Sequence, residues 1–194
     1  IVKELIRDPD KIVIFSTSPS VRVGFADGFG KEPGTFAQDE MVGALRALGA
    51  DYVLDVTFAA DLTIMEEGTE LLKRIENGGT LPMFTSCSPG WVRYIEYEYP
   101  DLLPHLSSAK SPHMMFGAIC KTYWAQKHNV DPKKIFVVSI MPCIAKKSGL
   151  IFHLRRIQMQ RRIFLRNKPM PAGLVLMVEM SAPRASIAPP IPTY

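Results

Sequence analysis

Two of the three cysteines in the chain follow short apolar runs, a position that suits a metal ligand. Cys87 comes a few residues after the run 81–83, and Cys143 comes soon after the run 135–140. If both runs are strands of one parallel sheet, both thiols lie at carboxyl ends of strands, where ligands bind in open sheets. Thiolates are natural ligands of iron–sulfur clusters. The pair therefore favours a metal site over a disulfide; the alternative is that each thiol is a small buried hydrophobe.

Other side chains near these cysteines could handle protons or anions. Glu67 and Glu70 stand three residues apart, so on a helix they share a face and could pass protons below a metal site. The alternative is an acidic face turned to solvent. Lys146 could donate to an anionic ligand of a metal, or it is an ordinary surface lysine. Cys120 is interpreted as a core residue. The histidines show no ligand spacing and are left unassigned: His105, His113, His128 and His153.

Strand and helix patterns alternate along the first 147 residues, which predicts an α/β fold with a mostly parallel sheet. Apolar runs predict strands at 12–16, 52–56, 82–86 and 135–140. Helices are predicted from a capping box at Thr35–Gln38 to Gly49, from an N-cap at Asp61 to Asn77, from Trp91 to Tyr99, and from Ser111 and Pro112 to about His128. A glycine-rich loop is expected at 24–34, and no further alternation of strands and helices is expected after Pro169.

Composition and charge bound the class of protein. With 194 residues, 47% of them apolar, the chain can bury a sizeable core, and three cysteines are too few for a disulfide scaffold. No secretory signal and no apolar run of roughly 18 residues is found, so a cytoplasmic protein without a membrane span is expected. Residues 1–150 carry 16 Lys and Arg against 18 Asp and Glu, whereas residues 151–194 carry 7 against 1. Because the basic excess lies in the last 44 residues, the net charge of +4 does not indicate a nucleic-acid partner.

Several stretches together resemble one enzyme family. Thr85-Ser86-Cys87-Ser88-Pro89-Gly90-Trp91 is similar to the first signature of the iron-only (FeFe) hydrogenases, and Met141-Pro142-Cys143 with Lys146-Lys147 is similar to the second. The stretches 60–70, 98–100 and 107–112 also resemble the family. The resemblance covers roughly residues 1–147.

The resemblance implies a fold, a cofactor and a reaction. The expected fold is two α/β lobes with the H-cluster between them, a four-iron cubane joined through a cysteine to a two-iron centre that carries CO, cyanide and a dithiolate. The expected activity is the reversible reduction of protons to H₂. The expected partners are ferredoxin or an electron-transfer subunit, together with maturation proteins.

Roles can be carried over to matching positions of this sequence. Cys143 resembles a cubane ligand, and Lys146 resembles the lysine that donates to a cyanide. The residues that resemble the lining of the two-iron pocket are Ser18, Pro19, Ser20, Pro112 and Met141. The residues that resemble the proton path are Cys87, Glu67, Ser107 and Glu70, with Arg74 beyond them. A thiol and carboxylates within hydrogen-bond reach can relay protons, which makes such a path chemically sensible.

The sequence departs from the family pattern in three places. Ser88 stands where the family has a second, adjacent cysteine, so either Cys87 or Ser88 takes the place of the metal ligand. His113 stands where the family usually has glutamine, and it adds a titratable group to the cofactor pocket. Gly149 stands in place of a glutamate, and no cysteine follows Cys143, so the third signature with its two cubane cysteines is absent.

We therefore expect a partial H-cluster domain at 1–149 and a basic, proline-rich tail unrelated to the family at 150–194. The tail is explained by a shifted reading frame, or it is a genuine surface-binding extension. The chain is expected to be a fragment of a hydrogenase catalytic subunit and to be inactive by itself. Two alternatives remain: a non-catalytic hydrogenase-like iron–sulfur protein of cluster assembly, and an H₂ sensor.

Overall fold

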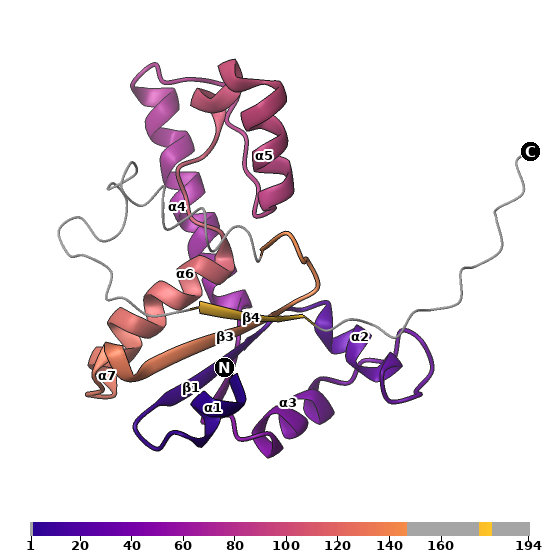
Figure 1. Ribbon diagram of the computed structural model, residues 1–194. Coiled ribbons are helices and arrows are strands. Elements are labelled where there is room, and N and C mark those ends of the chain that lie inside the picture. Colours follow the sequence, from indigo (N-terminus) through magenta and orange to yellow (C-terminus); the bar gives the residue numbers. More distant parts are fainter. Residues whose placement is uncertain (1, 147–174, 180–194) are drawn as a thin grey trace, which may run out of the picture.

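The computed structural model describes residues 2–146 and the backbone of residues 175–179 (Figure 1). Four parallel strands form one sheet in the order β2-β1-β3-β4. The strands are β1 (Ile12–Thr17), β2 (Tyr52–Asp55), β3 (Ile135–Met141) and β4 (Val175–Glu179). The α/β class and three of the four predicted strands are confirmed. No further alternation of strands and helices was expected after Pro169; one strand that the sequence did not predict, β4, lies there and pairs with β3.

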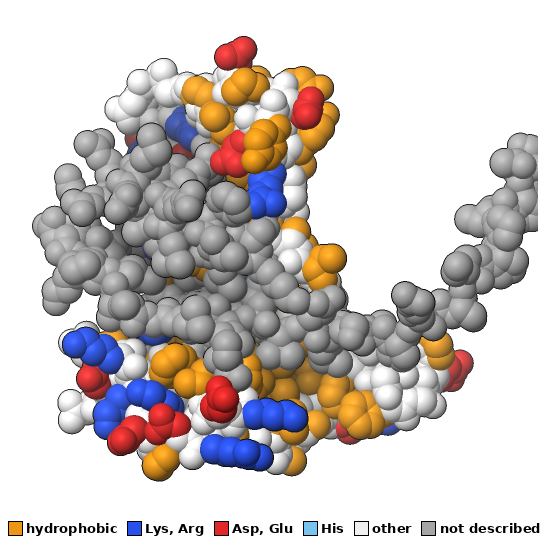
Figure 2. Space-filling model, viewed as in Figure 1, with side chains coloured by type: hydrophobic (Ala, Val, Ile, Leu, Met, Phe, Trp, Pro, Cys, Tyr) orange, Lys and Arg blue, Asp and Glu red, His pale blue; other side chains and the backbone are white. Residues whose placement is uncertain are grey.

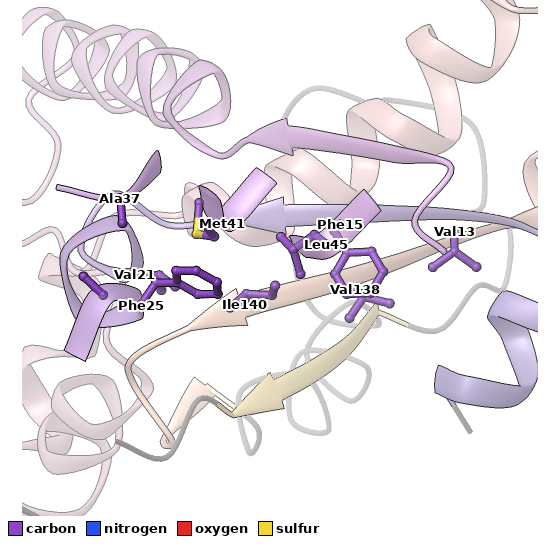
Figure 3. Packing of buried hydrophobic residues seen from close by; sticks show 10 residues of the cluster. Val13, Phe15, Val21, Phe25, Ala37, Met41, Leu45, Val138 and Ile140 are labelled. Carbon is purple, nitrogen blue, oxygen red and sulfur yellow. The ribbon is translucent and has the colours of Figure 1, made fainter. Parts of the chain in front are cut away.

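Alternating residues of β1 and β3 build a core on each face of the sheet. Val13 and Phe15 of β1 face one side, where they pack with Val138 and Ile140 of β3 and with α2 and α3; Figure 3 shows this cluster. Ile14 faces the other side, where Val137 and Met141 pack with α4 and α6. Because both faces are covered, the strands read as continuous apolar runs, which is why the sequence identifies them clearly.

The helices surround this sheet and extend beyond it. They are α1 (Val2–Arg7), α2 (Val21–Asp27), α3 (Gln38–Ala47), α4 (Thr57–Glu76), α5 (Pro89–Glu98), α6 (Pro112–Ile119) and α7 (Ala125–Lys127), with a π-helical turn at Cys120–Trp124 and 3₁₀ turns at Pro100–His105 and Pro132–Lys134. Figure 1 shows α4 running from the sheet to a region where it lies near α5. We call this region the arm: the C-terminal half of α4, residues 78–88, α5 and Pro100–His105. No helix of the described residues is long and apolar enough to cross a membrane.

Three local predictions near the first two strands were wrong. The expected loop at 24–34 begins inside α2, because Val21, Phe25 and Ala26 supply a buried helical stripe. The expected capping box does not form, since the Thr35 hydroxyl donates to the Glu32 carbonyl at 2.6 Å. Helix α4 begins at Thr57 rather than after Asp61.

The early start of α4 follows from the end of β2. The carboxylate of Asp55 accepts from the Thr57 N–H at 2.9 Å, which satisfies one amide of the first turn. Asp61 therefore lies inside the helix. Two other predicted helix boundaries are confirmed: α4 ends before Asn77, and Ser111 precedes Pro112 at the first position of α6.

The predicted strand at 82–86 does not belong to the sheet. This segment lies in the arm, where the Phe84 N–H donates to the His105 carbonyl and the Ser107 N–H donates to the Phe84 carbonyl, both at 2.8 Å. The apolar run before it is short, and Leu81 is 46% exposed, so it cannot serve as a strand buried on both faces. Cys87 consequently follows an extended segment of the arm rather than a sheet strand, whereas Cys143 does follow β3.

Candidate functional site

The strand order places a topological switch point at the carboxyl ends of β1 and β3, and we call this edge of the sheet the crevice. The chain leaves β1 to form β2 on one side, while the neighbour of β3 on the other side is β4. Ligands in open parallel sheets bind at such a switch point. The segments that follow the two strands are Ser18-Pro19-Ser20 and Pro142–Lys146, and the Ser18 N–H donates to the Ile140 carbonyl at 3.2 Å across the crevice. The sheet therefore brings the predicted residues Ser18 and Met141, both buried, to the same edge.

Lys146 connects this crevice to the arm. Its backbone N–H donates to the Cys143 carbonyl at 3.2 Å, and its ammonium donates to the Cys87 carbonyl at 2.5 Å. The side chain is only 8% exposed, so the alternative of an ordinary surface lysine is wrong. One side chain thus ties the loop of Cys143 to the loop of Cys87, although the two loops are far apart in sequence.

Cys87 is exposed and lines two adjoining pockets. The α4 pocket, of about 190 Å³, lies against α4 and includes Glu67, Lys110 and Pro112. The α5 pocket, of about 160 Å³, lies against α5 and includes Glu67, Ser107 and His113. Residues of the crevice line neither pocket within the described part of the chain: Ser18, Pro19, Ser20, Met141, Cys143 and Lys146. The predicted site therefore falls into a crevice part and a pocket part, and the Lys146 hydrogen bond to the Cys87 carbonyl joins them.

Ser88 and His113 both face the α5 pocket. Ser88 is the N-cap residue of α5, and its hydroxyl makes no capping hydrogen bond. His113 lies in the first turn of α6, is 3% exposed and shares a 3.0 Å hydrogen bond with the Ser111 hydroxyl. Since Cys87 and Ser88 line the same pocket, the geometry leaves open which of them takes the ligand place.

The carboxylate of Glu70 is held at both oxygens. Arg74 donates to Oε1 from Nη2 at 2.6 Å and from Nε at 3.1 Å. Oε2 accepts from the Ser107 hydroxyl at 2.9 Å, the Ser108 N–H at 2.9 Å and the Ser108 hydroxyl at 3.0 Å. Burial alone raises the pKa of Glu70 and is the largest single influence, but these hydrogen bonds together outweigh it and hold the pKa below its ordinary value.

Arg74 also fastens the arm. Besides its bonds to Glu70, its guanidinium donates to four backbone carbonyls, those of Thr80, Pro104, His105 and Leu106, at 2.7 to 3.3 Å. The planar fork of a guanidinium suits such multiple donation. Arg74 and Glu70 therefore fix the backbone that precedes Ser107 and Ser108.

Glu67 has the opposite environment from Glu70. It is half-buried on the wall of both pockets, and burial raises its pKa, with the Glu70 carboxylate adding to the rise. Two carboxylates one helical turn apart thus have pKa values pushed in opposite directions, a common arrangement where protons are handled. The alternative of a solvated acidic face is wrong for both residues, since neither side chain is exposed.

Two polar residues of this region escaped the sequence analysis. Ser108 contacts Glu70, and Lys110 lines the α4 pocket, where burial lowers the pKa of its ammonium. Their signal was the polar run 107–111, in which three serines and a lysine follow one another with one alanine between. The interpretation of Cys120 as a core residue is confirmed: it is 2% exposed, and burial raises the pKa of its thiol to about 12.

The donors present do not fit a complete four-iron cubane. Such a cluster is held by four cysteine thiolates, whereas the chain has three cysteines and one of them, Cys120, is buried in the core. At most two thiolates are therefore available. Within the described residues no three His, Cys, Asp or Glu side chains gather in a way that could hold a metal ion.

The parallel sheet and the two loops that carry Cys87 and Cys143 can be compared with those of known proteins, and the comparison identifies the family. The sequence profile described as iron only hydrogenase large subunit, C-terminal domain, matches residues 11–151. The chain therefore belongs to the iron-only hydrogenase family.

Individual relatives are similar over most of this chain. NADP-reducing hydrogenase subunit HndD of Solidesulfovibrio fructosivorans is 49% identical over 152 residues, which is 75% of this chain and 26% of that protein. Iron hydrogenase 1 of Clostridium pasteurianum is 48% identical over 160 residues, 82% of this chain and 27% of that protein. A solved structure of a variant of apo FeFe-hydrogenase HydA1 from Chlamydomonas reinhardtii superposes with a TM-score of 0.71 at 45% identity, covering 77% of this chain and 39% of that chain.

The relatives also include proteins that are not named hydrogenases. Cytosolic iron-sulfur assembly component 3 of Bos taurus is 33% identical over 145 residues, 72% of this chain and 30% of that protein. In every case this chain spans about a quarter to two fifths of the relative's length.

Proposed function

We propose that the chain is part of the H-cluster domain of an FeFe hydrogenase catalytic subunit, which reversibly reduces protons to H₂. The observation that supports this most strongly is the line of proton-handling groups beside Cys87. Glu67 and Cys87 share both pockets, Ser107 lines the α5 pocket, and the Ser107 hydroxyl donates to Glu70. A protein that only stores or transfers clusters has no need for such a line.

In this proposal the chain's own residues have distinct tasks. Cys87, Glu67, Ser107 and Glu70 pass protons between the pocket and the arm. Lys146 presents an ammonium at the junction of the two cysteine loops, where it can donate to an anionic ligand. Cys143 supplies a thiolate to a cluster. Met141, Ser18 and the exposed Pro19 and Ser20 shape the crevice, and Pro112 and His113 shape the pockets.

The H-cluster would supply the redox chemistry, but this chain alone does not provide its full ligand set. In the complete parent, we propose that the cubane ligands missing here come from further sequence. We propose ferredoxin or an electron-transfer subunit as the electron source, maturation proteins as assembly partners and the cytoplasm as the location. No role in nucleic-acid binding is proposed.

The second candidate is a cluster-assembly protein, and the available thiols favour it. Two accessible cysteines and a serine at the ligand place suit a chain that binds clusters without producing H₂. The half-buried Glu67, the fully hydrogen-bonded Glu70 and the buried Lys146 argue against this candidate. An H₂ sensor would need the same site, and a sensory module elsewhere in the gene would favour it.

The test compares the chain with a chimera in which the residues after Lys146 are replaced by the corresponding part of Iron hydrogenase 1. Both are produced anaerobically together with maturation proteins, and H₂ from reduced methyl viologen is measured by gas chromatography. We expect H₂ from the chimera and none from the chain itself. The matched control is Cys143→Ser in the chimera, which should abolish H₂. A folded, iron-loaded chimera that makes no H₂ would favour the cluster-assembly candidate.

A further inference from the structure

The two serines that hold Glu70 do so in different ways. The Ser107 hydroxyl donates to Oε2 at 2.9 Å and also accepts from the Ala109 N–H at 3.1 Å. Ser108 donates twice to the same oxygen, from its backbone N–H at 2.9 Å and from its hydroxyl at 3.0 Å. Ser107 thus gives Oε2 one donor, and Ser108 gives it two.

The serines also differ in what they face. Ser107 lines the α5 pocket with Glu67 and Cys87, whereas Ser108 lines neither of the two pockets of the described residues. Ser107 is therefore the hydroxyl between the pocket and Glu70. Ser108 contacts the carboxylate from outside both pockets, so it does not contact a group that enters either pocket.

We propose that Ser108 is a positioning residue of the proton path, which holds the Oε2 atom of Glu70 within reach of the Ser107 hydroxyl. The proposal rests on the proposed function, because a fixed Oε2 matters only if protons pass between Ser107 and Glu70. Proton transfer needs the heavy atoms about 2.6–3.2 Å apart. Ser108 gives Oε2 a backbone N–H and a hydroxyl, whereas Ser107 gives it one rotatable hydroxyl. Because rotation of the carboxylate would break both Ser108 bonds at once, Ser108 restrains Oε2 more than Ser107 does.

The other oxygen of Glu70 completes the arrangement. Arg74 on α4 donates twice to Oε1, so the carboxylate is fixed at both ends. Arg74 on α4 is the cation that lowers the pKa of Glu70, and the segment packed against α4 contributes the serine donors. Glu67, one turn earlier on α4, is itself affected by Glu70, whose carboxylate raises the pKa of Glu67. Loss of the Ser108 hydroxyl removes one donor from the charged carboxylate, so Oε2 is held less firmly and the pKa at which Glu70 takes up a proton should rise.

The first test measures the titration of Glu70 in the full 194-residue chain. The protein is labelled with ¹³C at the glutamate carboxyl carbons, and the Glu70 signal is identified by its absence in Glu70→Gln. In Ser108→Ala we expect the pKa of Glu70 to rise by up to about one unit, because a hydrogen bond to the charged form is lost. Ser108→Thr keeps both donors and should restore the original value.

Matched variants keep this test decisive. Thr35→Ala removes a hydroxyl that donates to the Glu32 carbonyl, outside the proposed site, and should leave the Glu70 titration unchanged. If Ser108→Ala does not fold, Ser108→Cys places a weaker donor at the same position and should give a smaller rise. An unchanged Glu70 pKa in a folded Ser108→Ala or Ser108→Cys protein would overturn the proposal.

A second measurement separates this inference from the proposed function. In the H₂-evolving chimera, Ser108→Ala should move the pH dependence of H₂ production upward, and Ser108→Thr should reverse the shift. If the chimera makes no H₂ while the Glu70 titration shifts as expected, the proposed function fails and the hydrogen bonding of Ser108 stands. If the chimera makes H₂ and Ser108→Ala leaves the pH dependence unchanged, the positioning role fails.

Discussion

The crevice and the arm bring their halves of the site into place by different means. On the crevice side, Met141 and Cys143 follow β3, and the position of that strand is fixed by backbone ladders and by two apolar cores. On the arm side, Cys87 and Ser107 lie on segments joined by two backbone hydrogen bonds and by the Arg74–Glu70 network. Figure 2 shows hydrophobic and charged side chains together on the outside of the arm, where Tyr97 is 76% exposed. The position of the crevice side therefore depends on the burial of apolar side chains, whereas the position of the arm side depends on a few polar contacts.

The largest expected effect concerns the crevice side. Ile14→Ala removes a fully buried side chain from the centre of the sheet and should lower the free energy of unfolding by about 3–4 kcal/mol. Chemical denaturation followed by circular dichroism measures it. Ile64→Ala on α4, where the side chain is 67% exposed, is the control and should cost less than about 0.5 kcal/mol. Equal costs for the two variants would mean that the sheet core does not determine stability.

The next effect concerns the arm. Arg74→Ala leaves the half-buried Glu70 without its cation and frees four carbonyls, so we expect a loss of about 3 kcal/mol. The loss should be local: amide hydrogen exchange should accelerate at 104–108 and remain slow in β1. The exposed Lys73 provides the control Lys73→Ala. Equal acceleration in β1 and in the arm would show that the two halves unfold as one unit, which would contradict their being held in place by separate means.

A smaller effect of opposite sign, an increase in the stability of the protein, is expected when Lys121 beside the sheet is replaced. The Lys121 side chain is 2% exposed, and its ammonium has no hydrogen-bond partner among the residues that the structure describes, although the Phe136 ring lies 5.9 Å away. Lys121→Met removes this buried charge and should raise stability by about 1 kcal/mol. Thermal melts against the exposed control Lys133→Met check it. A lower melting temperature in Lys121→Met would show that the ammonium contributes to the fold.

The smallest effects test the two carboxylates. The folded-state pKa of Glu70 is lowered, so its stabilisation is present at neutral pH and is lost as the pH falls through that pKa. Glu70→Gln should therefore destabilise the protein at pH 7 and cost less at pH 3. The pKa of Glu67 is raised, so Glu67→Gln should stabilise the protein at pH 7 by a few tenths of a kcal/mol. Denaturation at both pH values measures this; shifts of the same sign would contradict the opposed environments.

The difference between the crevice side and the arm side also determines which parts of the structure the sequence predicts. The strands at 12 and 135 were predicted correctly because burial on both faces leaves an uninterrupted apolar run. The edge strand at 52 was also predicted from its apolar run, although it is only partly buried. The segment 82–86 also has apolar residues, but it pairs with one other short segment outside the sheet. Nothing in a short run distinguishes these two environments, so the strand prediction failed there.

The candidate site shows a similar contrast. Residue type and spacing indicated Cys143, Lys146, Glu67 and Glu70, and the structure gives each a buried or half-buried place. Ser108 was missed because its two hydrogen bonds to Glu70 cross a 38-residue separation. Such a contact depends on tertiary structure and leaves no periodic pattern in the sequence.

The register of the central strands has a consequence for synthesis on the ribosome. Ile12 pairs with Ile135, so the middle of the sheet joins residues 123 positions apart. At about 5–20 residues per second, roughly 6–25 s pass between the synthesis of β1 and that of its partner. During this interval β1 can pair with β2, but its other edge lacks a neighbour, and such non-local pairing forms slowly. Nascent chains that have not reached Met141 therefore expose an apolar strand edge, a kind of surface that makes incomplete chains prone to aggregation.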